Sequence, residues 1–115
     1  MPDAVLIDFG PGMTPEVYDQ INDRVNPPGS KPPGLLFHCA GPSPDGGWRI
    51  IDVWDSRATF DAFLESMVMP TVAELLGPEA VSQGPPPTIE SWSLHNLESC
   101  DPGPLAAARR DAAAG

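Results

Sequence analysis

The stretch that decides the fold is residues 34–56, which read GLLFHCAGPSPDGGWRIIDVWDS. Two apolar runs, 34–41 and 48–54, flank a turn that contains Asp45-Gly46. Aspartate followed by glycine suits a tight turn with positive φ, and short apolar runs rich in β-branched and aromatic residues are typical of strands. The stretch therefore predicts a β-hairpin, followed by a helix that Ser56 caps.

The helix after the hairpin is predicted from the spacing of its apolar residues. They recur as on one helical face: Phe60, Phe63, Leu64 and Met67. Pro70 interrupts this helix because proline lacks a backbone N–H and crowds the carbonyl four residues earlier. We therefore expect a kink near residues 67–70 and a second short helix that ends at Gly77.

The flanking sequence supplies the other elements. Residues 4–9 form an apolar run closed by glycine and proline, which predicts a first strand. Thr14 and Pro15 suit a helix start, and that helix stops before Pro27. Residues 88–97 predict a fourth strand. The order β-α-β-β-α-β is the ferredoxin-like arrangement of the α+β class, a four-stranded antiparallel sheet with helices on one face.

Both faces of the predicted sheet are largely apolar. In the third strand, Ile51 and Val53 oppose Ile50 and Trp54. A face in contact with water would instead carry polar residues at alternate positions. Because the helices cover one face only, we expect the second face to pack against another copy of the chain, so that the protein is a homodimer.

Composition limits the partners and the location of the 115-residue chain. It has 6 basic and 16 acidic residues, a formal net charge of -10, whereas a nucleic-acid surface must be basic. We expect no nucleic-acid partner, no membrane partner and, without a signal-like N-terminal segment, a cytoplasmic location. The expected domain spans residues 1–97. Residues 98–115 have one large apolar residue, Leu105, and are expected to form a flexible tail.

Three segments together resemble a known superfamily: residues 34–42, residues 47–63 and the strand end Leu94-His95-Asn96-Leu97. They are similar to the dimeric α+β barrel superfamily, above all its antibiotic-biosynthesis-monooxygenase-like branch. The resemblance implies two subunits packed sheet on sheet, with helices outside and a pocket in each subunit. Members include cofactor-independent oxygenases of polycyclic aromatic metabolites, haem-degrading enzymes, isomerases or cyclases, and proteins without known activity, so fold alone does not choose the chemistry.

His38 and Asp52 are the candidate catalytic residues. They lie on adjacent predicted strands, and if the faces of the hairpin coincide they are neighbours or diagonal partners. A carboxylate that orients an imidazole in an apolar pocket makes a plausible general base. The alternative is a buried polar pair that satisfies itself and fixes the subunit register. Asp8 is a further carboxylate that we expect near the same cluster.

The candidate substrate-binding residues are mainly aromatic and apolar: Trp54, Trp48, Trp92, Leu36, Ile50 and His95. In the resembling oxygenases a tryptophan at the end of the third strand borders the substrate, which is the position of Trp54. Aromatic walls suit a planar apolar ligand. Core or dimer packing is the alternative for the tryptophans, and capping of the sheet edge for His95.

No cofactor or metal is expected. The sequence has no glycine-rich dinucleotide motif, no P-loop and no paired-cysteine zinc motif. Cys39, within the second strand, is expected to be a small buried residue rather than half of a disulfide with Cys100. The sequence and its resemblance thus favour a homodimer that binds an aromatic or polyketide-like metabolite. One possibility is an enzyme with a histidine base, either monooxygenase-like or an isomerase/cyclase. The alternative is a non-catalytic ligand-binding or accessory protein.

Overall fold

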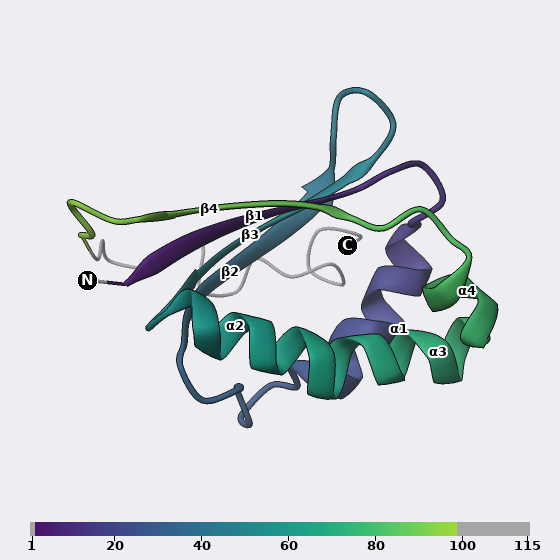
Figure 1. The fold of residues 1–115 in the computed structure, drawn as a ribbon, viewed down its shortest axis with the longest axis horizontal. Coiled ribbons are helices and arrows are strands. Elements are labelled where there is room, and N and C mark those ends of the chain that lie inside the picture. The colour runs from purple at the N-terminus through teal and green to yellow at the C-terminus, as the bar shows by residue number, and fades with distance from the viewer. Residues whose placement is uncertain (1, 99–115) are drawn as a thin grey trace, which may run out of the picture.

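The computed structural model describes residues 2–98, so the tail predicted over residues 98–115 lies outside the described residues except for Glu98. A single sheet and a helical layer make up this part of the chain (Figure 1). The elements in chain order are β1 (Asp3–Phe9), α1 (Pro15–Val25), β2 (Leu35–Pro42), β3 (Trp48–Trp54), α2 (Arg57–Phe63), a π-helical segment (Leu64–Val68), α3 (Met69–Leu76), α4 (Pro78–Ser82) and β4 (Thr88–Ser93).

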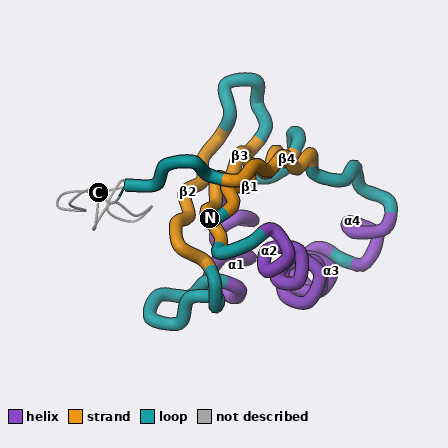
Figure 2. The backbone as a smooth tube through the Cα atoms, turned by 60° about the vertical axis from the view of Figure 1, so that its left-hand side comes forward, coloured by secondary structure: helices purple, strands orange, loops and turns teal. Residues whose placement is uncertain are grey.

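The sheet has the strand order β2-β3-β1-β4, with every neighbouring pair antiparallel. Helices α1, α2 and α3 lie on one face of it, below the sheet in Figure 1, and the turned view in Figure 2 shows the four strands edge to edge. This arrangement confirms the predicted α+β ferredoxin-like fold. β4 ends at Ser93 rather than at the predicted Leu97.

Local signals start both main helices as predicted. The Thr14 hydroxyl accepts a hydrogen bond from the Val17 N–H at 3.2 Å, and Pro15 occupies the first turn of α1. The Ser56 hydroxyl accepts one from the Thr59 N–H at 3.1 Å and caps α2. Each cap satisfies an amide that has no partner within the first turn of a helix.

The kink predicted near residues 67–70 takes the form of a π-helical segment. Here the Met69 N–H reaches back five residues to the Leu64 carbonyl, and α3 continues directly from it. Pro70 explains the extra residue, because a wider turn relieves the clash between its ring and the carbonyl four residues earlier. After Gly77, at φ 95°, the chain forms α4, a turn of helix in a segment for which the sequence analysis predicts no element. The five residues of α4 are too few to show a periodic pattern.

The core lies between the sheet and α2. Its centre is formed by Val5, Ile7, Trp54 and Phe60. A bulge in β2 at Leu36 places Leu35 on the same face as His38, which corrects the strict alternation expected for that strand.

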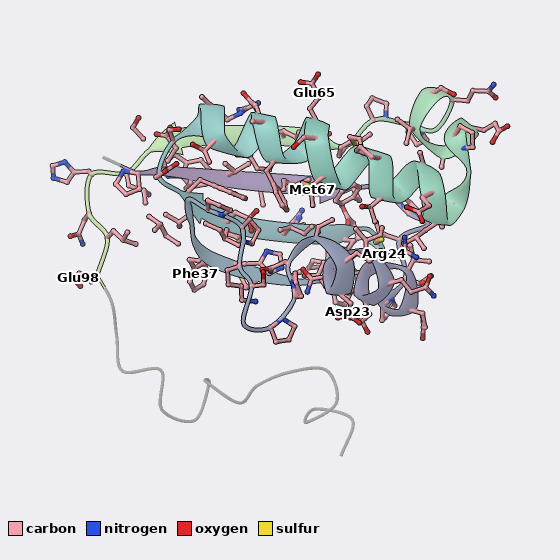
Figure 3. The ribbon with its side chains drawn as sticks, turned by 90° about the horizontal axis from the view of Figure 1, so that it is seen from below. Asp23, Arg24, Phe37, Glu65, Met67 and Glu98 are labelled. Carbon is pink, nitrogen blue, oxygen red and sulfur yellow. The ribbon has the colours of Figure 1, made fainter. Side chains whose placement is uncertain are left out.

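The opposite face of the sheet has no covering layer in the single chain. It carries Phe37, Ile51 and Trp92, which are 51%, 43% and 50% exposed. Figure 3, seen from the helical side, shows Phe37 apart from α1 and from the α2–α3 helix. We call this surface the open face.

Candidate active site

The two candidate catalytic residues are neighbours. His38 pairs with Asp52 in the β2–β3 register, and the His38 Nδ1 lies 2.6 Å from the Asp52 Oδ1. This confirms the predicted proximity of the pair. Both side chains lie on the helix-covered face, and Asp52 is only 5% exposed.

The hydrogen bonds of Asp52 fix the protons on the imidazole. A carboxylate only accepts, so the His38 Nδ1 carries a proton and donates it to the Asp52 Oδ1. The Trp54 Nε1 donates to the Asp52 Oδ2 at 3.1 Å. Both carboxylate oxygens are therefore satisfied despite burial, and in the neutral imidazole the Nε2 atom is left as an acceptor.

Tyr18, which the sequence analysis does not place in the site, completes the arrangement. Its hydroxyl donates a hydrogen bond to the His38 Nε2 from α1. The Tyr18 and His38 rings are parallel within 5°, and the Trp48 ring lies 5.1 Å from the Tyr18 ring, centroid to centroid. The only sequence signal for this position was that Tyr18 lies beside the apolar stripe of α1 that includes Ile21. Its side chain therefore faces the sheet. We refer to Tyr18, His38, Asp52 and Trp54 as the polar chain.

The polar chain borders a cavity between the sheet and the helices. The cavity has a volume of about 60 Å³, and all four members of the chain line it. The remaining wall is almost entirely apolar, with Ile7 and Ile50 from the sheet and Ile21, Phe63 and Leu64 from the helices. Figure 3 shows α1 beside the α2–α3 helix over this space, and the Arg24–Glu74 ion pair, at 3.0 Å, joins α1 to α3. The site is thus a chain of hydrogen-bonded groups, able in principle to pass a proton, at the wall of a mainly apolar cavity.

A second polar feature on the wall is Asn26, which the sequence analysis did not single out. It is 5% exposed, its side-chain N–H donates to the Asn22 Oδ1 at 3.4 Å, and its own Oδ1 has no hydrogen-bond partner among the described residues. Tyr18, Asn22 and Asn26 recur every four residues, so they form one stripe of α1, and all three line the cavity.

The structure places only some of the predicted substrate-binding residues at the cavity. Ile50 and Trp54 line it, and Trp54 is 1% exposed. Trp48 shares their face but is buried outside the cavity lining, against Tyr18. Leu36 lies outside the cavity because the bulge turns it outward, where it is 55% exposed.

Trp92 and His95 are also outside the cavity. Trp92 lies across from Ala4 in the sheet register, which puts it on the open face. His95 follows the end of β4, because this strand is shorter than predicted, and its side chain is exposed. Neither residue therefore lines this cavity, in contrast with the expectation from the sequence.

Two further expectations are corrected on the open face. Asp8 does not join the polar chain. Its carboxylate accepts a hydrogen bond from the Arg49 Nε at 3.3 Å, because their register puts both on the face away from the helices. Cys39 is an exposed free thiol rather than a buried small residue, because it alternates with His38 onto this face.

Residues 2–98 contain neither a metal-binding cluster nor a membrane-spanning helix. No group of three or more His, Cys, Asp or Glu side chains lies close enough to hold a metal ion. No helix in that range is long and apolar enough to cross a membrane.

Comparison with known proteins gives matches in structure only. No protein-family model and no curated protein matches the chain. A protein of unknown function from Nitrosomonas europaea superposes with a TM-score of 0.61 at 14% identity, over 87% of this chain and 95% of that one.

Two similar structures are oxygenases. A mutant of SnoaB, a cofactor-independent oxygenase from Streptomyces nogalater, has a TM-score of 0.53 at 16% identity and covers 84% of this chain and 95% of its own. A monooxygenase from the gene ActVA-Orf6 of Streptomyces coelicolor, solved with the ligand nanaomycin D, has a TM-score of 0.50 at 20% identity, over 87% and 93%. The chain therefore shares the ferredoxin-like fold of these oxygenases, the fold that its sequence resemblance implied.

Proposed function

We propose that the protein abstracts a proton from a hydroxylated aromatic or polyketide-like metabolite without a metal or organic cofactor. The observation that carries this proposal is the polar chain, which runs from a phenol through an imidazole to a buried carboxylate at the wall of an apolar cavity. This arrangement supplies a base, a group that orients it and an environment that excludes water.

The hydrogen bonds set the order of proton transfer. Because the Tyr18 hydroxyl covers the His38 Nε2, Tyr18 is the group that meets the ligand. As its oxygen accepts a proton from the ligand, its own proton passes to the Nε2 atom. The imidazolium that forms is stabilised by the carboxylate of Asp52. His38 is therefore the base and Tyr18 the relay, a refinement of direct abstraction by His38.

The reaction that follows depends on the ligand anion. A carbanion next to a carbonyl is isomerised when it is protonated at another position. With dioxygen as co-substrate, an acidic methylene group gives two electrons to each oxygen atom of O₂: one atom becomes the new carbonyl oxygen and the other leaves in water. The fold shared with two oxygenases supports this second outcome, since such chemistry needs from the protein only a base and a dry pocket.

A non-catalytic ligand-binding protein is the second candidate function. Two observations favour it: the Nε2 atom of His38 is already occupied by Tyr18, and the cavity of about 60 Å³ is well below the roughly 300 Å³ of common ligand pockets. In this case the polar chain holds α1 against the sheet and the cavity selects a ligand by its shape.

We further propose that the protein acts as a homodimer that joins the open faces of two sheets. Phe37, Ile51 and Trp92 together present an apolar surface on one face, where a monomer would normally carry polar residues. Pairing of two such faces removes this surface from water and leaves the cavity, which is on the helical side, intact in each subunit.

Oxygen uptake with an anthrone tests the catalytic proposal. The methylene group of 1,8-dihydroxyanthrone is acidic, and its conversion to a carbonyl consumes dioxygen. We expect the parent protein to accelerate uptake, and His38→Gln to lower the rate on the order of 10²-fold because the base is lost. Tyr18→Phe should lower it about tenfold, since the relay oxygen is lost while the imidazole remains.

The matched control is His95→Gln, because His95 is exposed and follows β4, the edge strand opposite β2 in the sheet. Its rate should equal that of the parent. Equal rates for His38→Gln and the parent would contradict the proposal. Calorimetric binding of the anthrone without oxygen uptake or isomerisation would favour the non-catalytic candidate.

A further inference from the structure

A hollow at the edge of β2 adjoins the cavity at the polar chain. It has a volume of about 190 Å³ and is formed by the end of α1, the loop of residues 26–34 and the first residues of β2. Figure 2 shows this loop projecting beside the end of β2. Three side chains line both spaces and therefore separate them: Asn26, Leu35 and His38. The other lining residues are exposed, so the hollow is open to solvent: Lys31, Leu36 and Phe37.

Asn26 brings an unpaired acceptor to this boundary. Its side chain is buried, its Oδ1 has no hydrogen-bond partner within residues 2–98, and the bond from its own N–H to the Asn22 Oδ1 is long, at 3.4 Å. The role of Asn26 as the cap of α1 uses only its backbone N–H, which donates to the Asn22 carbonyl at 2.8 Å. A buried acceptor without a donor is costly, and a terminal amide turns readily about its last torsion. The Asn26 carbonyl is therefore available to a donor that a ligand supplies.

Lys31 brings an unpaired cation to the same hollow. The chain has a formal net charge of -10, and each arginine of residues 2–98 forms an ion pair with a carboxylate. Lys31 forms no ion pair with any residue in that range, although acidic residues are in excess. Its ammonium group is therefore free to donate hydrogen bonds to a ligand.

The loop holds Lys31 in a restricted position. Prolines flank it on both sides and fix the backbone φ there: Pro27, Pro28, Pro32 and Pro33. A hydrogen-bonded turn precedes Lys31, in which the Ser30 N–H donates to the Pro27 carbonyl at 3.2 Å. Another follows it, in which the Leu35 N–H donates to the Pro32 carbonyl at 3.2 Å. The backbone at Lys31 thus loses little freedom when a ligand binds.

The two groups require different atoms from a ligand. The Asn26 carbonyl needs a hydrogen-bond donor, whereas the Lys31 ammonium needs an acceptor. A carboxylate or an ester offers acceptors only and leaves Asn26 unsatisfied. A hydroxyl has its donor and its acceptor on one atom, whereas a carboxamide carries them on two atoms, which suits side chains from two separate elements.

We propose that the hollow is a subsite for a neutral primary carboxamide, whose N–H donates to the Asn26 Oδ1 and whose carbonyl accepts from the Lys31 Nζ. The ring that bears this group lies past His38, in the cavity, because His38 lines both spaces. The inference deepens the proposed function: it rests on an aromatic ligand at the polar chain and names a substituent of that ligand.

Four naphthalenes that differ only in the group at carbon 2 test the subsite. They are 2-naphthamide, 2-naphthoate, methyl 2-naphthoate and 2-naphthylmethanol, with binding followed by their own fluorescence. None carries a phenol, so the result does not depend on proton transfer through Tyr18. We expect the parent protein to bind 2-naphthamide about tenfold more tightly than each of the others, because only the carboxamide satisfies both side chains on separate atoms.

Two variants remove the two partners in turn. Asn26→Leu, of similar size, and Lys31→Met, of similar length, should each reduce the tenfold preference over the methyl ester to about threefold or less. The matched controls should keep it: Asn96→Leu, at an exposed position outside the hollow, and Lys31→Arg, which retains the charge and the donors. Asn26→Leu should also unfold at the same temperature as the parent or higher, because its Oδ1 makes no bond in the free protein.

The outcomes separate the subsite from the proposed function. Equal affinities for the four probes, tighter binding of 2-naphthoate, or a preference that either Asn26→Leu or Lys31→Met leaves unchanged would overturn the carboxamide subsite. If Asn26→Leu failed to fold, Lys31→Met, on an exposed loop, would decide alone. Oxygen uptake with the anthrone that depends on His38 would still support the polar chain. Absence of that uptake, with the tenfold preference intact, would support the subsite and reject the catalytic proposal.

Discussion

The two faces of the sheet are both apolar in sequence, but they differ in what their polar residues do. On the helical side, Asp52 is buried and both of its oxygens accept hydrogen bonds. On the open face, Asp8 pairs with Arg49 while partly exposed, among aromatic and aliphatic side chains that nothing in the single chain covers. Burial of a charged group requires built partners, and only the helical side supplies them.

This contrast favours the helical side of the sheet as the place for chemistry and the open face as the surface for association. A buried carboxylate connected through an imidazole to a phenol at a cavity wall has the hydrogen bonds that the proposed proton transfer needs. A flat apolar face with one exposed ion pair is instead suited to packing against a second copy.

The largest effect is expected from Trp54, compared with Trp92 on the other face. Trp54 is 1% exposed and packs on Phe60 and Phe63, with ring centroids 6.0 and 5.1 Å away. Trp54→Ala should lower the free energy of unfolding by about 4 kcal/mol, because it leaves a cavity and removes a donor from Asp52. Urea unfolding measures the loss.

Trp92→Ala is the matched comparison, since Trp92 is 50% exposed. Its effect should be smaller and should grow with protein concentration, because association of the open faces contributes more stability when the protein is concentrated. Equal losses for the two variants at every concentration would contradict the division between the faces.

A somewhat smaller effect is expected when His38 is removed. His38→Ala leaves one oxygen of the buried Asp52 without a donor, and we expect a loss of about 3 kcal/mol in the free energy of unfolding. His95→Ala, at an exposed position, should change it by less than about 0.5 kcal/mol. If His38→Ala were as stable as the parent, the His38–Asp52 pair would contribute no net stability to the fold. Its role would then be functional only.

Much of the fold was predictable because local patterns agree with it. The Asp45-Gly46 turn, the caps at Thr14 and Ser56 and the effect of Pro70 all act through neighbouring residues, so the sequence carries their signals directly. The hairpin allowed His38 and Asp52 to be neighbours or diagonal partners if its faces coincide, and the register of the structure makes them direct partners.

The rest of the site depends on contacts between distant segments. Tyr18 meets His38 only because α1 packs over β2, and no pattern within α1 specifies which strand lies beneath it. Trp92 was misplaced because an alternating strand does not reveal which of its faces the helices cover. The bulge at Leu36 has no sequence signal that we recognise, yet it decides which leucine faces the cavity.

The next prediction tests the association side of the comparison. Ile51→Glu places a carboxylate in the centre of the open face, where a partner sheet would bury it without a donor. We expect the dimer dissociation constant to rise on the order of 10²-fold, measured by sedimentation equilibrium. Gln20→Glu adds the same charge on an exposed position of α1 and should leave association unchanged. A parent protein that is monomeric at micromolar concentration would overturn the dimer.

The smallest effect is expected at Asp45. Like the buried Asp52, Asp45 accepts two hydrogen bonds, but it lies in solvent. The Ser43 hydroxyl and the Gly47 N–H donate to Asp45 in the hairpin turn, and they lower the pKa of its carboxyl from the ordinary 3.8. A lowered pKa in the folded state stabilises the fold above pH 3.8, and this contribution disappears as the pH falls through the lowered value.

Asp45→Asn should therefore melt slightly below the parent at neutral pH, by about 1 °C or less, since the group is fully exposed. The difference should shrink as the pH falls below 3.8 and through the lowered pKa, where the parent carboxyl gains its proton. Calorimetric melts at several pH values measure both trends. A loss of stability in Asp45→Asn as large as that in His38→Ala would show that hydrogen bonds alone, without burial, make an aspartate strongly stabilising in this protein. Burial would then no longer distinguish the polar residues of the two faces.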